Sequence, residues 1–485
     1  MTSTFFGLEL SQRALNAQQT ALNITGQNIA NANTQGYSRQ IGNLTATTPE
    51  TISVSGGTMS IGTGVTLDTI TRARDAMVDN QFRSETSKQQ YWGTKQTNLT
   101  DVEGIMNEPS DSSLSGELNT FWNSWSDLSN DPTDATTSSE VLQQAATLTD
   151  SFHSISAQIS DLQNNIDSNV QNEIPQINDY ASQIKDLNNQ IKQAEAAGDQ
   201  PNDLYDSRDN LVDELSQLVN VKVTETPDTS FSSGQVSNYK IEIGDPPQTL
   251  VDGGVANQLV GVTNPTGLGG NEITTVQWAN GNPLTLSQGG GALQANIETR
   301  DTDLTALQGK YDDLATGIAT AVNDIYQAGT GTETGSGTGT FFDVPATASS
   351  LSVSTSTATD NIVGTGRSGD GSIAAAISSL SSGWSNLTGT DLSDLKTNYG
   401  TSLGNFYSAT VTQLGVDVQQ ATSQKSAEDA LVTNATNQRE STSSVSVDEE
   451  MTNLVLYQNA YAAAARMVTM MDDMLSTLMN MGVTK

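Results

Sequence analysis

Apolar residues at the two ends of the chain recur at helical spacing. From Met1 to Ser38 only Glu9 and Arg13 are charged, while Leu8, Leu15, Leu22 and Ile29 recur every seven residues. After Val447 a second series steps by three and four: Leu454, Tyr457, Tyr461, Ala464, Val468, Met471, Leu475 and Leu478. Such spacing places each series on one stripe of a helix. We therefore predict paired helical termini, residues 1–38 and 440–485, that meet each other or other subunits.

Between these ends the pattern changes several times. Alternating apolar residues after Gly36, interrupted by glycines, predict short strands or an extended arm over residues 39–72. Helical spacing returns over residues 73–220, where Leu114, Leu118, Phe121, Trp125 and Leu128 share one face. Because a proline inside a helix costs about 3 kcal/mol, Pro175 predicts a kink or short break near Asn172.

The second half of the chain alternates between β and helical patterns. Residues 221–292 predict a small β domain, with Asn280-Gly281 as a two-residue hairpin turn. Helical spacing resumes over residues 293–328 and 373–439, separated by a glycine-rich linker and a short β excursion at 329–372. Asn437 to Ser444 is predicted to be a polar hinge. The fold class is mainly α with inserted small β domains: the terminal helices are paired as a coiled coil, a long helical bundle follows, and the β insertion lies outward.

Energetic magnitudes explain why the terminal stripes need partners. An isolated helix of this length is marginally stable in water, whereas burial of each Leu, Met or Val contributes about 1.5–3 kcal/mol. Seven of the eleven methionines lie in the last 35 residues, and the flexible thioether lets one stripe pack against several partners. We expect the ends to fray alone and to become rigid in an assembly.

Composition narrows the function classes. The formal net charge of −35 disfavours nucleic acid and anionic membranes as partners. The absence of cysteine excludes disulfides, thiolate metal sites and cysteine nucleophiles, and His153 is the single histidine. The chain contains no window of about twenty apolar residues that would predict a membrane-spanning helix. Met1 to Gly7 also lacks the basic residue expected at the start of a signal peptide. An extracellular location would require export without a cleaved leader.

Four features imitate chemical sites. Gly364 to Gly369 fits the G-x-G-x-x-G pattern, but the polar strand before it is unlike a buried parallel strand. Asp448 and Glu450 fit the first turn of a helix, with Ser446 and Glu449 forming a capping box. The Asp203, Asp206 and Asp209 run lacks the EF-hand glycine, and we interpret it as a solvated helix face. No nucleophile accompanies His153. We predict no catalytic, cofactor-binding or metal-binding residues, and no enzyme.

Two motifs resemble one protein family. The N-terminal loop reads Asn28-Ile29-Ala30-Asn31-Ala32-Asn33-Thr34-Gln35-Gly36-Tyr37-Ser38-Arg39-Gln40, and the C-terminal motif is Ser446-Val447-Asp448-Glu449-Glu450-Met451. Both resemble the signatures of the axial proteins of the bacterial flagellum, which comprise rod, hook and hook-associated proteins. The long helices and the Asp203 to Leu211 segment are similar to the hook-associated members.

The resemblance implies a structural protein of the hook–filament junction that self-assembles through its terminal helices and is exported outside the cell. Its implied partners are hook protein, the adjacent hook-associated junction protein, further copies of itself in a ring or tube, and an export chaperone at the C-terminal helix. The predicted assembly residues are those of the two stripes. Alternatives are another flagellar axial subunit, a self-assembling acidic surface adhesin whose β insertions bind glycans, and an enzyme. Trp278 alone resembles a glycan-binding aromatic residue in a β loop.

Overall fold

The computed structural model describes residues 5–54, 57–110, 113–228, 236–287, 289–330, 339–355, 370–384 and 397–483. Its contacts divide the chain into two compact units. The terminal unit comprises residues 1–86, 178–258 and 429–485, and the middle unit comprises residues 87–177 and 259–428. The fold is mainly α with small inserted sheets, as predicted. The finer domain boundaries drawn from the sequence stay predictions.

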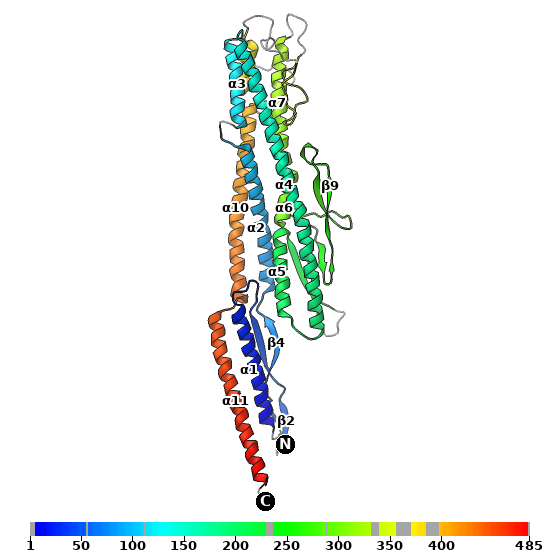
Figure 1. Cartoon of the computed structure of the whole chain (residues 1–485), viewed down its shortest axis with the longest axis vertical. Coiled ribbons are helices and arrows are strands. Elements are labelled where there is room, and N and C mark those ends of the chain that lie inside the picture. Colours follow the sequence, from blue (N-terminus) through cyan, green and yellow to red (C-terminus); the bar gives the residue numbers. More distant parts are fainter. Residues whose placement is uncertain are drawn as a thin grey trace. The chain divides into compact units, whose positions relative to one another are not determined.

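The helices follow the helical pattern of the sequence closely (Figure 1). They are α1 (Phe6–Asn31), α2 (Ala76–Met106), α3 (Leu114–Asn130), α4 (Ala135–Ala196), α5 (Asn202–Leu218), α6 (Gly291–Glu298), α7 (Leu304–Thr330), α8 (Ser372–Ser378), α10 (Leu403–Ser443) and α11 (Val447–Val483). A π-turn, η2 (Thr299–Asp303), joins α6 to α7, and two 3-10 turns are η1 (Leu268–Gly270) and η4 (Ser379–Ser381). No helix within the described ranges is long and apolar enough to cross a membrane.

All strand pairs in the described residues are antiparallel. In the terminal unit β1 (Gln40–Ala46) pairs with β4 (Val65–Arg72), and β2 (Glu50–Val54) pairs with β3 (Gly57–Ile61). We call these four strands the ribbon. A four-stranded sheet follows the order β5 (Val221–Pro227), β6 (Ser237–Ile243), β7 (Gln248–Asp252) and β8 (Val255–Ala256). In the middle unit β9 (Leu259–Asn264) pairs with β10 (Ile273–Trp278).

In the terminal unit, α1 lies between α11 and the ribbon (Figure 1). The approach to α11 is close at Gly7, because a Cβ atom built there would lie 2.5 Å from Cε of Met471. The approach to the ribbon is close at Gly42, where a Cβ would lie 2.8 Å from Leu67 and 2.9 Å from Ile24. The terminal helices are therefore paired, as predicted, and short strands occupy the region predicted as strands or an extended arm.

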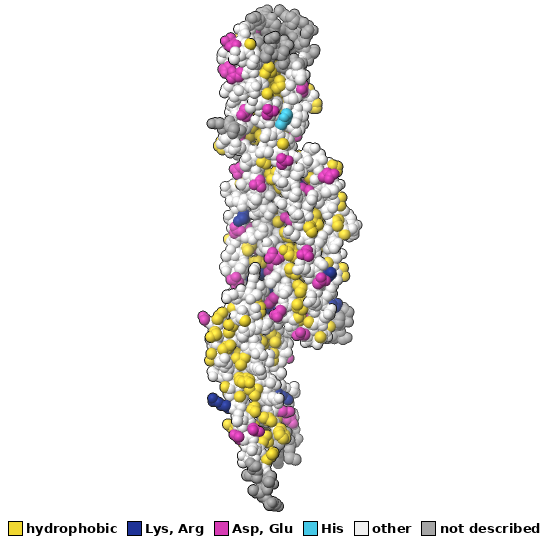
Figure 2. Space-filling view, in the orientation of Figure 1, with side chains coloured by type: hydrophobic (Ala, Val, Ile, Leu, Met, Phe, Trp, Pro, Cys, Tyr) yellow, Lys and Arg dark blue, Asp and Glu magenta, His cyan; other side chains and the backbone are white. Residues whose placement is uncertain are grey.

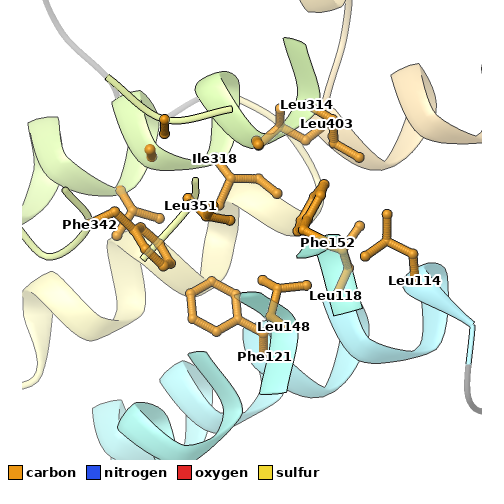
Figure 3. Close-up of a cluster of buried hydrophobic side chains, with 14 of the residues drawn as sticks. Leu114, Leu118, Phe121, Leu148, Phe152, Leu314, Ile318, Phe342, Leu351 and Leu403 are labelled. Carbon is orange, nitrogen blue, oxygen red and sulfur yellow. The ribbon is translucent and has the colours of Figure 1, made fainter. Parts of the chain in front are cut away.

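The middle unit is held by a large hydrophobic core (Figure 3). The α3 face predicted from the sequence is buried, with Phe121 and Trp125 fully inaccessible. Side chains from α4, α7 and α10 meet it, including Phe152, Ile318 and Leu403. Ser113 caps α3 by accepting a hydrogen bond from the Gly116 amide at 3.4 Å.

Three helix predictions need correction. α4 runs through Pro175 as one helix of 62 residues, so of the kink or short break predicted near Asn172 the break is absent. A long apolar face of α4 is buried on both sides of Pro175, and this burial outweighs one lost backbone hydrogen bond. α10 continues to Ser443, so the link to α11 is shorter than the predicted Asn437–Ser444 hinge. The helix predicted from Ile373 is interrupted after α8.

The turn after β10 also differs from its prediction. Trp278 donates its amide to the Asn282 carbonyl at 2.8 Å, and Gly281 donates to the Trp278 carbonyl at 2.8 Å. These bonds enclose a loop of three residues, with Gly281 at φ 86°, rather than two. The β excursion reduces to one bridge between Phe342 and Val353 among the described residues. Residues 331–338 of the glycine-rich linker and Gly364 to Gly369 lie outside the described residues.

Candidate assembly site: the paired termini and the loop that joins them

The α1 helix buries mostly small and polar residues within the terminal unit. Ala17, Ala21, Ile24, Thr25 and Asn28 are at most 6% exposed. The predicted assembly residues Leu8, Leu15, Leu22 and Ile29 are half-buried. Because α1 contacts both α11 and the ribbon, its buried surface is wider than one heptad stripe. The half-buried leucines therefore retain apolar surface for further contacts.

On α11 the residues of the predicted stripe are largely the half-buried ones. We call this set the inner stripe: Leu454, Tyr457, Tyr461, Ala464, Val468, Met471, Leu475 and Leu478. All are half-buried except Tyr461, which is 37% exposed, and Leu478, whose side chain lies outside the described residues. Met471 meets Gly7 of α1, so this stripe faces the partner helix.

A second apolar stripe on α11 is exposed. It consists of Leu456, Ala463, Met467, Met470 and Met474, at helical spacing, and we call it the outer stripe. Its leucine and three methionines are between 44% and 60% exposed. Figure 2 shows hydrophobic side chains gathered over α11. Exposed apolar patches of this kind are typical of interaction surfaces. The residues of the outer stripe recur at helical spacing in the sequence too, but the prediction from the sequence contains only one apolar stripe for this helix.

The loop after α1 is closed by one buried amide. Asn28 accepts a hydrogen bond from the Gln40 amide at 3.0 Å and donates to the Gln40 carbonyl at 2.9 Å. The Tyr37 hydroxyl donates to the same Asn28 oxygen at 2.8 Å. Asn28 is 1% exposed, so losing these bonds would leave polar groups buried without partners. We call residues 32–39 the clasp loop, and its sequence signature has this physical basis.

Gly36 allows the clasp loop to turn. Its φ is +76°, a left-handed conformation that side chains with a Cβ rarely adopt. A Cβ atom there would also lie 2.0 Å from Oδ1 of Asn210 on α5. Both observations require glycine at this position.

Replacing Gly36 by alanine is expected to lower the free energy of unfolding of the terminal unit by about 1–3 kcal/mol, because of backbone strain. Amide hydrogen exchange in α1 and α5 measures the loss. Gly26→Ala is the matched control, since Gly26 lies in α1 with no atom near its missing Cβ, and alanine there should stabilise by up to about 1 kcal/mol. Equal effects of the two substitutions would contradict the role of Gly36.

The clasp loop binds the start of α11. Arg39 donates from Nε to Glu450 at 2.8 Å, and its Nη1 lies 3.3 Å from Glu449. The Arg39 amide donates to the Ser443 carbonyl at 2.9 Å. Ser446 caps α11 through the Glu449 amide at 3.4 Å, as predicted. The carboxylate of Glu449 contacts Arg39, so the acidic run also connects the two ends of the chain.

An ion-pair cluster anchors the clasp loop to α5. Its members are Arg72 on β4, Arg74, Asp79 and Arg83 at or near the start of α2, Asp206, Asp209 and Asp213 on α5, and Arg439 on α10. Asp206 accepts from the Ser38 amide at 3.0 Å and from its hydroxyl at 2.6 Å. Asp206 and Asp209 are each 6% exposed. The predicted solvated face was therefore wrong for Asp206 and Asp209, because arginines distant in sequence neutralise these carboxylates, whereas Asp203 is exposed as predicted.

The electrostatics of the cluster favour charged carboxylates. Burial alone would raise the pKa of Asp209, but the guanidinium groups of Arg74, Arg83 and Arg72 hold it well below its ordinary range. Burial raises the pKa of the Tyr37 hydroxyl, and the neighbouring Asp203 and Asp206 raise it further. Tyr37 is therefore a neutral hydrogen-bond donor at physiological pH.

A groove of about 960 Å³ lies beside the cluster, between β4, the start of α2, α5 and the edge of the β5–β6 sheet. Its arginines are already engaged: Arg72 contacts Asp206 and Asp209 at 2.8 Å, and Arg208 stacks on the Tyr239 ring at 3.6 Å. Among the described residues no group of three or more acidic or histidine side chains could hold a metal ion. We therefore interpret the groove as part of the structural network.

Comparison with known proteins explains this arrangement of the two ends. Residues 8–37 match the family model of the flagella basal body rod protein. Residues 437–481 match the C-terminal model of the flagellar basal body rod FlgEFG proteins. The matched segments contain the main parts of α1 and α11 and most of the clasp loop. A chain with both segments, paired in space, has the design of a flagellar axial subunit.

The remainder of the chain defines the subunit more closely. Residues 99–342 match the helical domain of flagellar hook-associated protein FlgK. Flagellar hook-associated protein 1 of Bacillus subtilis is 32% identical over 100% of this chain and 99% of its own length. The chain belongs to the flagellar hook-associated protein 1 family. The resemblance inferred from the sequence motifs is confirmed.

Other relatives match a smaller part. Flagellar hook-associated protein 1 of Salmonella typhimurium is 29% identical over 64% of this chain and 54% of that protein. The Escherichia coli protein of the same name is 26% identical over 65% and 56%. The flagellar hook junction protein FlgK from Burkholderia pseudomallei is a similar solved structure, with 26% identity, a TM-score of 0.44, and coverage of 52% of this chain and 44% of that one.

Family membership makes this protein a structural component of the flagellum, an exported extracellular structure, that assembles with other flagellar components. The residues that sequence reasoning missed are Asn28, the ion-pair cluster and the outer stripe. Charge patterning could have suggested the cluster, since Arg72, Arg74 and Arg83 follow one another closely in an acidic chain. No local pattern pairs them with α5.

Proposed function

We propose that this protein forms the junction between hook and filament by assembling through the terminal pair, α1 and α11. The supporting observation is that α11 carries two apolar stripes. The inner stripe is half-buried in the terminal unit beside α1, whereas the outer stripe is exposed. One stripe stabilises the subunit, and the other remains for neighbours.

The proposed neighbours are hook protein, the adjacent hook-associated junction protein and further copies of this chain in a ring or tube. Burial of each outer-stripe methionine or leucine would contribute about 1.5–3 kcal/mol. The burial of several such residues on one helix is sufficient to decide whether a subunit stays in the assembly. Flexible methionines suit a surface that must fit more than one partner.

Before export, the same stripe would be exposed in the cell. We propose that an export chaperone covers the C-terminal helix at that stage. The support is the 44–60% exposure of the outer-stripe leucine and methionines, which makes this surface prone to unwanted association. The protein then leaves the cell without a cleaved signal peptide.

The junction role is mechanical. The clasp loop joins α1 to α5 through Ser38 and Asp206, and to α11 through Arg39 and Glu450. Charged hydrogen bonds of this kind are short and directional. These bonds would keep α1 and α11 in a fixed orientation relative to α5. The subunit could then connect a hook and a filament that differ in stiffness.

The test is capture by immobilised hook protein and by the next junction protein. Leu15→Asp and Val468→Asp place a charge in the terminal pair, and Met470→Asp places one on the outer stripe, so all three should lose capture. Thr469→Asp, on an exposed polar position of α11 away from both stripes, is the control and should bind like the natural chain. Undiminished capture by all three variants would refute the proposed use of these helices.

A further inference from the structure

Arg466 is an isolated cation on the exposed side of α11. It is the single basic residue between Val447 and Val483, in a chain of net charge −35. The side chain is exposed, and no carboxylate of the described residues lies within ion-pair distance of it. Arg466 is adjacent in sequence to Met467 of the outer stripe. A subunit that packs on the outer stripe would therefore lie close to the unpaired charge of Arg466.

Two aspartates share the side of the helix on which Arg466 lies. Asp448 is 18 residues earlier, which is five helical turns or about 27 Å, and Asp473 is seven residues later, about two turns or 10.5 Å. Both are exposed, and neither has an ion-pair partner among the described residues. These separations along a rigid helix are too long for an ion pair within one chain. A copy displaced along the helix axis would bring one of these aspartates opposite Arg466.

We propose that Arg466 forms an ion pair with Asp448 or Asp473 of α11 in a second copy of this chain. This inference rests on the proposed function, because it assigns a register to the same assembling helices. The outer stripe supplies apolar contact that tolerates sliding, whereas a single charge pair penalises the wrong register. A displaced, parallel contact uses different surfaces on the two copies, and such contacts build rings or filaments rather than closed pairs.

Disulfide trapping tests this directly, because the natural chain contains no cysteine. Full-length Arg466→Cys/Asp448→Cys and Arg466→Cys/Asp473→Cys chains are expressed in a strain lacking the natural protein. Isolated flagella are then oxidised. A disulfide requires Cα atoms within about 7 Å, so neither pair can close within one helix. We expect one pair to give products of multiple chain length.

The control pair is Arg466→Cys/Asp472→Cys, since Asp472 is exposed but lies on a different side of the helix. Products from neither test pair, or equal products from the control, would overturn the proposal. Products from Arg466→Cys alone would indicate a two-fold contact and would also overturn it. A product joined to a different protein would assign this face to another partner, with the same consequence.

Charge reversal supplies a second readout. Arg466→Asp is expected to reduce the protein retained in flagella, Arg466→Lys to preserve it, and Asp448→Arg or Asp473→Arg to restore the Arg466→Asp chain. Restoration by neither aspartate variant would count against the proposed pair. Met470→Asp distinguishes a failure of the ion pair from a failure of the proposed function. If Met470→Asp abolishes retention in flagella while the cysteine pairs give no product, only the ion pair is refuted. If Met470→Asp has no effect, the proposed function fails.

Discussion

Replacing Asp209 by asparagine is expected to lower the free energy of unfolding of the terminal unit by about 3–5 kcal/mol. The substitution keeps the shape of the side chain but removes the charge that faces Arg72, Arg74 and Arg83. Arg83 would suffer most, because its side chain is 3% exposed and, among the residues that the structure describes, would retain only Asp213 as an ion-pair partner. Amide hydrogen exchange in α5 and the clasp loop measures the effect.

Glu214→Gln is the control for Asp209→Asn, because Glu214 lies on the exposed side of α5 and its carboxylate accepts a hydrogen bond from the Gln217 side chain. The five tryptophans are all in the middle unit, so tryptophan fluorescence should show an unchanged transition in the Asp209→Asn chain. Exchange protection equal to that of the natural chain would show that the cluster contributes little.

The same carboxylate fixes the direction of the pH response. The pKa of Asp209 is lower in the folded protein than in the unfolded chain, so folding disfavours protonation. Its contribution is complete above the ordinary Asp pKa of about 4 and is lost as the pH falls below that value. Acid should therefore loosen the clasp loop in the natural chain more than in the Asp209→Asn chain.

Replacing Trp125 by alanine is expected to destabilise the middle unit by about 3–5 kcal/mol. Trp125 is fully buried and packs against Phe121 and Phe341 at ring-centroid distances of 6.3 Å and 5.2 Å. Alanine would leave a cavity among close-packed helices. Unfolding by guanidinium, followed through the four remaining tryptophans and circular dichroism, gives the loss.

Trp125→Phe is the matched variant. The indole Nε1 of Trp125 has no hydrogen-bond partner in the structure, so phenylalanine retains the aromatic packing and removes an unsatisfied donor. We expect its destabilisation to be clearly smaller than that of alanine. Similar losses for both variants would contradict the role assigned to aromatic packing at this position.

The sequence predicted α11 better than α1 for a physical reason. The inner stripe of α11 faces one partner, so heptad spacing identifies most of its half-buried residues. α1 contacts a helix and a ribbon at once, and its buried positions include the small Ala17 and Ala21, which hydropathy does not distinguish. Helical stripes can be read locally, whereas contact on two sides depends on distant segments.

The buried charges could not be read from the chain in the same way. Asp206 and Asp209 have the acidic, helical setting of a solvated surface, and only the fold brings Arg72 and Arg83 to them. Asn28 likewise resembles any polar residue at the end of a helix, and only the fold brings Gln40 within hydrogen-bond distance of it. The sequence motif located the clasp loop, but the hydrogen bonds that hold it join residues that are far apart in sequence.

The position of α1 has a consequence for the order of folding. Its partner α11 begins at Val447 and is separated from α1 by more than 400 residues of sequence. Contacts between such distant segments close large loops and form late. During synthesis the first helix must therefore wait for the last one, and a prematurely terminated chain never acquires it. A chain that ends before Val447 therefore leaves the α11-facing side of α1 uncovered.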